Sequence, residues 1–136
     1  MGFILNLFPM NFFPLILVIL YERADIAKKY INMDITTIIT PENFLYMTAA
    51  LLLATLSWEM VKATIYAPKG SGTWLDFMMS FLLLIAIILY IANIVMKHGG
   101  TPSKLILLVV EAQLFDVVVG FILAISNARR DLNMGG

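Results

Sequence analysis

The segment from Lys104 to Asn127 constrains the fold more than any other part of the sequence. It is apolar and longer than the roughly 20 residues that a helix needs to cross a bilayer. Near its centre, however, stand Glu111, Gln113 and Asp116. A central carboxylate costs about 2.5 to 3.5 kcal/mol on the insertion scale, because lipid supplies no hydrogen-bond partner. The face that carries the acids must therefore meet other helices, water or another subunit.

The composition predicts a membrane protein. Hydrophobic residues make up 61% of the 136 residues, charged residues make up 13%, and the mean hydropathy is +0.92. Soluble domains are nearer half apolar and about a quarter charged. The net charge of zero offers no electrostatic footprint for nucleic acid, so we expect no nucleic-acid partner. The chain has no cysteine, which excludes disulfides and thiolate metal sites, and we expect neither a metal nor another cofactor.

The pattern of apolar segments predicts an all-α fold, with a single transmembrane domain over residues 1–136 and short loops. Thr40-Pro41 and Thr101-Pro102 have the capping hydroxyl and the proline that are typical of helix starts. Pro9 and Pro14 predict a kink in the first helix, and a re-entrant or interfacial segment is the alternative for that stretch. The bundle is predicted to contain four transmembrane helices, at about residues 3–21, 44–67, 74–96 and 104–127, and an amphipathic juxtamembrane connector at 22–40.

Polar side chains recur at helical spacing in the predicted spans. In the second helix, Glu59 and Lys62 stand one turn apart and can neutralise each other. Counting 1.5 Å per residue places Asp116 at about 21 Å and Glu59 at about 27 Å below the prolines at which their helices start. The third helix runs the other way, which brings Tyr90 and Asn93 to about the level of Glu111. The predicted intramembrane polar site comprises Glu111, Asp116, Gln113, Glu59, Lys62, Tyr90 and Asn93.

Two further features concern helix packing and helix starts. Small residues recur every four positions along the fourth helix, a stripe that lets another helix approach closely. This predicted packing interface comprises Ala112, Asp116, Gly120, Ala124 and Ala128. Asp116 lies in the stripe and is expected to be structural, whereas Glu111 lies off it and is the first acid to test for function. Thr73 is predicted to cap the third helix with Asp76 as its capping-box partner, which would leave Asp76 at the interface.

Three functions remain open. The first is a non-catalytic multi-pass subunit that packs, within the lipid bilayer, in a larger membrane complex or a homo-oligomer. The alternative is a small proton or cation channel or transporter that uses the intramembrane carboxylates. The third is a holin-like protein that permeabilises the membrane. We expect no enzyme activity, because the sequence has no metal-ligand cluster, no nucleophile beside a histidine and no phosphate-binding loop.

The distribution of basic residues predicts an orientation. Four spans place both termini on one side of the membrane, and the loops after the first and third helices carry more lysine and arginine than the other side. By the positive-inside rule, loops 22–43 and 97–104 are cytoplasmic and the termini face outward. We expect the chain in a bacterial inner membrane or its equivalent and not in an outer membrane, since outer-membrane proteins are β-barrels.

Overall fold

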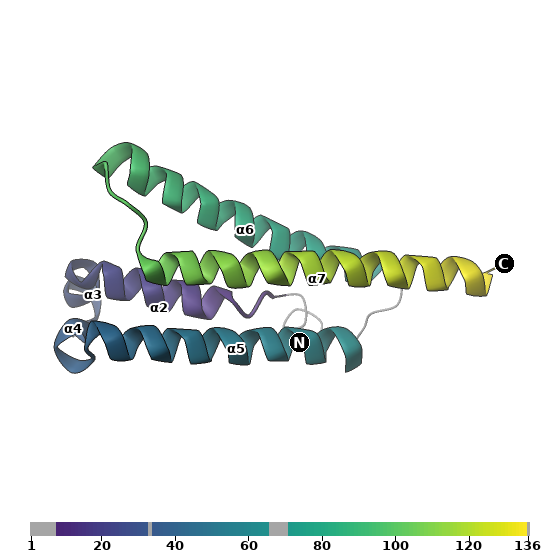
Figure 1. Cartoon of the computed structure of the whole chain (residues 1–136), viewed down its shortest axis with the longest axis horizontal. Helices are drawn as coiled ribbons and strands as arrows, with labels where there is room; N and C mark the ends of the chain where they lie inside the picture. Colours follow the sequence, from purple (N-terminus) through teal and green to yellow (C-terminus); the bar gives the residue numbers. More distant parts are fainter. Residues whose placement is uncertain (1–7, 33, 66–70, 136) are drawn as a thin grey trace.

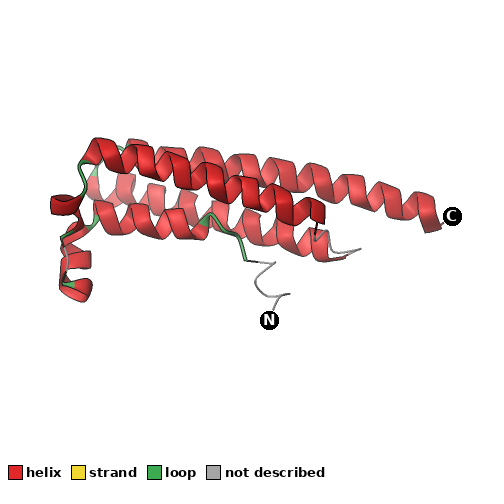
Figure 2. Cartoon of the chain, turned by 90° about the horizontal axis from the view of Figure 1, so that it is seen from below, coloured by secondary structure: helices red, strands yellow, loops and turns green. Residues whose placement is uncertain are grey.

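The computed structural model describes residues 8–32, 34–65 and 71–135, and within these ranges every regular element is a helix (Figures 1 and 2). The predicted all-α fold is therefore confirmed. The helices are α2 (Phe12–Glu22), α3 (Ala24–Ile31), α4 (Ile35–Ile38), α5 (Pro41–Ile65), α6 (Ser71–His98) and α7 (Lys104–Gly135).

Three of these helices are long and apolar enough to cross a membrane. Their candidate spans are Pro41–Lys62 in α5, Trp74–Lys97 in α6 and Lys104–Arg130 in α7. This finding supports integration into a membrane. The fourth predicted span is not confirmed: α2 has 11 residues, about 16 Å of helix, which is half of a hydrocarbon core of about 30 Å. Residues 3–7 of that prediction lie outside the described residues.

The two prolines explain where α2 begins. Pro9 lies in an irregular turn just before the helix, and Pro14 lies in the first helical turn, where its missing N–H is not needed. Because both prolines lie at the start of α2, the predicted kink is not confirmed. The predicted connector over 22–40 folds into α3 and α4, and Asn32 ends α3 in the left-handed conformation with a φ of 55°.

The long helices begin and end differently from the prediction. The α5 helix starts at Pro41, where the Thr40 hydroxyl accepts a hydrogen bond from the Asn43 N–H. The α6 helix starts at Ser71, so Thr73 and Asp76 lie inside it, and the predicted capping box is wrong. The α7 helix continues to Gly135, and its last turns project beyond the other helices (Figure 1).

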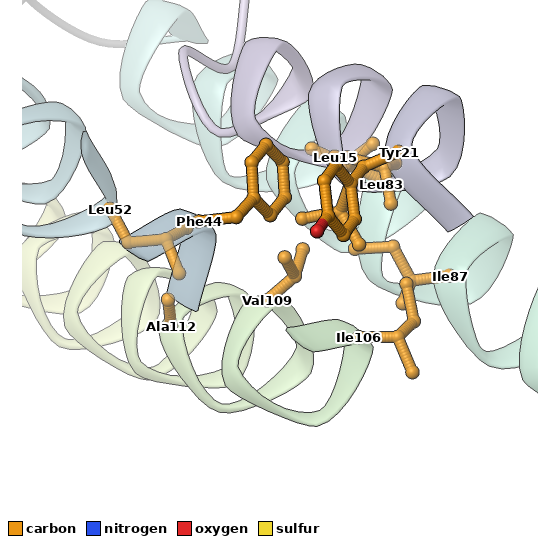
Figure 3. Packing of buried hydrophobic residues seen from close by; sticks show 10 residues of the cluster. Leu15, Tyr21, Phe44, Leu52, Leu83, Ile87, Ile106, Val109 and Ala112 are labelled. Atoms are coloured by element: carbon orange, nitrogen blue, oxygen red, sulfur yellow. The ribbon is translucent and has the colours of Figure 1, made fainter. Parts of the chain in front are cut away.

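The long helices pack around α7, which makes its most extensive contact with α6 and also contacts α5 and α2. One half of the bundle is filled by side chains that form the apolar cluster (Figure 3). Within it, the rings of Tyr21 and Phe44 stack with centroids 3.8 Å apart. This contact joins the end of α2 to the start of α5, and the two helices run antiparallel (Figure 1). The apolar cluster consists of Leu15, Val18, Tyr21, Phe44, Leu52, Leu83, Ile87, Ile106, Val109 and Ala112.

Candidate functional site

Polar side chains from α2, α5, α6 and α7 meet in the other half of the bundle, and we call this group the polar cluster. Most of its members are buried, although the helices that carry them have apolar outer faces. The polar cluster consists of Asn11, Thr55, Glu59, Lys62, Asp76, Ser80, Gln113 and Asp116.

The charged part of the polar cluster lies on α5 and α6. Lys62 Nζ lies 2.7 Å from Glu59 Oε2 and 3.3 Å from Asp76 Oδ1. The Lys62 and Glu59 side chains are only 4% and 5% exposed, so little water screens this ion pair. The contact with Asp76 is electrostatic, since the buried Asp76 Oδ1 has no partner with hydrogen-bond geometry. One ammonium group therefore serves two carboxylates.

Gln113 joins three helices at the inner end of the polar cluster. Its Nε2 donates to the backbone oxygen of Ser80 at 2.9 Å and to Asp116 Oδ2 at 3.4 Å. Its Oε1 accepts a hydrogen bond from Asn11 Nδ2 at 3.0 Å. The Ser80 side chain also lies against the Asp116 carboxylate. Gln113 thus connects α2, α6 and α7.

The irregular backbone before α2 belongs to the same site. The Met10 N–H donates to Glu59 Oε1 at 2.8 Å, and Lys62 Nζ donates to the backbone oxygen of Phe8 at 3.5 Å. The Thr55 hydroxyl donates to Asn11 Oδ1 at 2.6 Å. Asn11 was not among the predicted site residues. An asparagine between two prolines in an apolar segment was the signal that pointed to it.

The charges of the polar cluster do not balance. Asp116 lies within electrostatic reach of Glu59, Asp76 and Lys62, so that among the described residues three carboxylates share one ammonium. When all four groups are ionised, acids outnumber bases, which is unfavourable in a membrane interior. Among the described residues, no group of three or more His, Cys, Asp or Glu side chains has an arrangement that could hold a metal ion. A proton or a small monovalent cation would reduce the imbalance.

The polar cluster extends along only part of the candidate spans. On α6, Asp76 follows the start of the span at Trp74 by about 3 Å, and on α5, Lys62 lies at the end of the span. Gln113 lies about 14 Å from the start of α7. Beyond it the apolar cluster fills the bundle. We call these two parts the polar half and the apolar half.

The structure brings together some of the predicted site residues and leaves others apart. Glu59, Lys62, Gln113 and Asp116 all belong to the polar cluster. Three do not: Glu111 is exposed on the outer face of α7, and Tyr90 and Asn93 are half-buried on α6. Asp116, expected to be structural, therefore lies in the buried network, whereas Glu111 lies outside it.

The small-residue stripe of α7 packs within the chain. Ala112 and Ala124 are buried, and Asp116, Gly120 and Ala128 are half-buried. A Cβ at Gly120 would lie 3.9 Å from the Phe77 ring on α6, which is ordinary van der Waals contact. The stripe is thus a contact surface for α6, in keeping with the close helix approach that small residues permit.

Asp76 belongs to the polar cluster, although its sequence context predicts a capping residue at the interface. Its distance of three residues from Thr73 resembles a capping box. The same residue also stands one turn before Ser80, on the face of α6 that continues with the buried Leu83 and Ile87. That spacing of four, three and four residues was the signal for an inward-facing acid.

Comparison with protein families, with curated proteins and with solved structures finds no match to this chain. Its function must therefore be argued from the site itself.

Proposed function

We propose that the chain is a small, non-catalytic membrane protein that moves protons, or another monovalent cation, by way of the polar cluster. The observation that carries this proposal is the largely buried network of Glu59, Lys62, Asp76 and Asp116, in which acids outnumber bases among the residues that the structure describes. Ionisable groups inside a membrane are expensive and usually mark ion or proton pathways. Asp116 is the acid of this network that lies deepest from the Trp74 side of the bundle.

The apolar half limits how such a protein can work. The polar cluster reaches Gln113, and side chains such as Val18, Ile87 and Val109 fill the bundle beyond it. This arrangement favours uptake of the proton or cation from the side of the polar half. Passage through the apolar half would then require a rearrangement of the helices or a partner protein that completes the path. It argues against a channel that stays open.

Proton flux into proteoliposomes tests the proposal. The purified chain is reconstituted with an internal pH-sensitive dye, and a pH gradient is imposed in the presence of a potassium ionophore. We expect acidification above that of protein-free vesicles, and we expect Asp116→Asn to abolish it. Glu111→Gln is the matched control, because it removes an acid of the same helix outside the polar cluster. Vesicles without flux, or equal flux in Asp116→Asn, would show that the network is only structural.

A second function, a subunit of a larger membrane complex or of a homo-oligomer, is favoured by the exposed Glu111. This acid stands on the outer face of α7 among exposed apolar residues that include Leu114 and Phe115. A central acid facing lipid costs about 2.5 to 3.5 kcal/mol, and a polar group on a partner would offset that cost.

Native mass spectrometry of the chain in mild detergent and in nanodiscs tests the second function. We expect an oligomer or a co-purifying protein, and we expect Glu111→Leu to weaken the association. A chain that is monomeric under both conditions would exclude this function. The two functions are decided by different acids of α7, because loss of flux is expected in Asp116→Asn and loss of association in Glu111→Leu.

We further propose a bacterial inner membrane or its equivalent, with the end of the bundle formed by α3 and α4 in the cytoplasm. Arg23, Lys28 and Lys29 lie at that end. The polar half then opens to the outer side. Since the chain has no cysteine, single substitutions at the exposed Tyr30 and Leu132 can be labelled with an impermeant maleimide. Labelling of Tyr30→Cys in intact cells would show that the chain has the opposite orientation.

A further inference from the structure

Glu111 is an acid on the outside of the bundle, away from the ends of its span. Within the three candidate spans, every other exposed Asp, Glu, Lys or Arg side chain belongs to the first two or the last two residues of its span. Those side chains can reach the membrane surface. Glu111 follows the start of its span at Lys104 by seven residues, which is about 10 Å of helix. Because polar groups at such depth require polar partners, the carboxyl group needs a partner outside this bundle.

The surface around Glu111 has the spacing of a contact between two helices. Exposed side chains follow one another along α7 at intervals of four, three, four and three residues, which is the a and d spacing of a left-handed helix pair. Most helix pairs in membranes cross in this way. We call this surface the outer seam, and it consists of Leu107, Glu111, Leu114, Val118 and Phe121.

The outer seam fits a second copy of α7 better than it fits another part of a second copy. A two-fold axis along the membrane normal brings each residue beside the axis to its own counterpart at the same depth. Glu111 would thus meet Glu111. Away from their ends, the described spans of α5 and α6 expose no Asp, Glu, Lys or Arg side chain. A copy that docked through either of those helices would therefore leave Glu111 without a charged or acidic partner.

We propose that two copies of the chain associate through the outer seam, with their α7 helices parallel and their Glu111 side chains hydrogen-bonded to each other. A carboxyl group that holds a proton is both a donor and an acceptor, so two such groups satisfy each other without a basic residue. Leu107, Leu114 and Val118 pack above and below the pair. The proposal rests on the second function, association through Glu111, and it names the partner and the contact.

Disulfide cross-linking in native membranes tests the contact, because the chain has no cysteine of its own. Single cysteines are introduced at Leu107 and Val118 in the outer seam, and at the exposed Leu53 of α5 and Leu89 of α6 as controls. A disulfide requires Cβ atoms about 4 Å apart, which residues beside a two-fold axis can reach. With a membrane-permeant oxidant, we expect Leu107→Cys and Val118→Cys to give a product of twice the mass of the chain. Leu53→Cys and Leu89→Cys should give little.

Energy transfer between donor- and acceptor-labelled chains in lipid vesicles tests the role of Glu111. The dyes are attached at Leu132→Cys, an exposed position near the end of α7. Loss of an interhelical hydrogen bond in Glu111→Leu should raise the dissociation constant roughly 3- to 30-fold. Glu111→Gln should stay close to the wild type, since an amide also donates and accepts. Ser57→Leu is the matched control, because it removes an exposed polar side chain of α5 whose hydroxyl donates to its own helix at Leu53.

The outcomes separate this contact from association in general. A chain that shows no energy transfer overturns both the second function and the symmetric contact. Energy transfer without a cross-link at Leu107→Cys and Val118→Cys overturns the symmetric contact alone, as does a cross-link to a different protein. Loss of association in Glu111→Gln also overturns it, because that result would assign a basic partner to Glu111.

Discussion

The two halves of the bundle use the same helices but are held together differently. On α6, the inward face carries Asp76 and Ser80 in the polar half and then Leu83 and Ile87 in the apolar half. The other helices show the same change, since α2 passes from Asn11 to apolar residues and α5 passes from apolar residues to Thr55, Glu59 and Lys62. In the apolar half, the helices are held together by close packing of side chains. In the polar half, they are held together by hydrogen bonds and ion pairs whose members share partners, so the loss of one contact weakens the others.

This difference matters more in a membrane than in water. Lipid is as apolar as the apolar cluster, so burial of apolar area contributes little, and tight packing and interhelical hydrogen bonds must hold the helices together. In the polar half, the loss of one partner leaves another group buried and unpaired. We therefore expect the polar half to be sensitive to the loss of one charge, and the apolar half to be sensitive to the loss of volume.

The largest effect is expected from Lys62→Met, which removes the single base of the polar cluster. Breaking a buried ion pair by removing one partner costs about 3 to 5 kcal/mol. Here it leaves both Glu59 and Asp76 without a cation. We expect the variant to unfold at a markedly lower denaturant concentration in a titration with a denaturing detergent.

The double variant Glu59→Gln, Lys62→Met is the control for the charge. It removes one acid together with the base, and so it should regain part of the lost stability. Equal stability of wild type and Lys62→Met would mean that the contacts of Lys62 are dispensable, and the contrast between the two halves would fail.

The next effect concerns the apolar half. Ile87 is fully buried and Ile88, its neighbour on α6, is 51% exposed. Ile87→Ala leaves a cavity between packed helices, and such substitutions cost about 2 to 5 kcal/mol, whereas Ile88→Ala should change the unfolding free energy by less than about 0.5 kcal/mol. The same detergent titration measures both. Similar losses in the two variants would mean that packing does not hold this half together.

Much of this architecture follows from the sequence. The three long helices were predictable, because their apolar length and their proline and threonine starts are local signals. The polar face of α5 was predictable from spacing, since Glu59 and Lys62 stand one turn apart and are both buried. One member of the small-residue stripe of α7, Gly120, lies beside Phe77 of α6.

Other features depend on contacts that no local pattern contains. The inward position of Asp76 depends on Lys62 of another helix, and the capping-box pattern beside it was misleading. Rotation along α7 separates Glu111 from the small-residue stripe. Whether the face of α7 that carries Glu111 meets another helix or lies outside the bundle depends on the order of helices around α7. The extent of α2 depends on the polar partners of Asn11.

A smaller effect is expected where α7 approaches α6 in the polar half. The Cβ of Gly120→Ala would meet Phe77 at ordinary contact distance, so the substitution should be tolerated. It should change the unfolding free energy by no more than about 1 kcal/mol, in the stabilising direction, because the unfolded chain loses freedom. Gly120→Leu should push α6 away and cost about 1 to 3 kcal/mol. A destabilising Gly120→Ala would mean that α6 and α7 lie too close together at Gly120 to accommodate a methyl group.

The smallest effect is expected at the edge of the apolar half, where the Ser103 hydroxyl donates to the Glu22 carboxylate outside the three candidate spans. Burial raises the pKa of Glu22, although Arg23 opposes the shift. The folded state therefore holds this proton more firmly than the unfolded state does. The resulting stability is fully present below the ordinary carboxyl pKa and is lost as the pH rises through the raised value.

Melting temperatures measured across that range should fall slightly with rising pH in the wild type, and the part of the fall due to Glu22 should vanish in Glu22→Gln. A Glu22→Gln variant whose stability changes with pH as in the wild type would mean that groups other than Glu22 cause the fall.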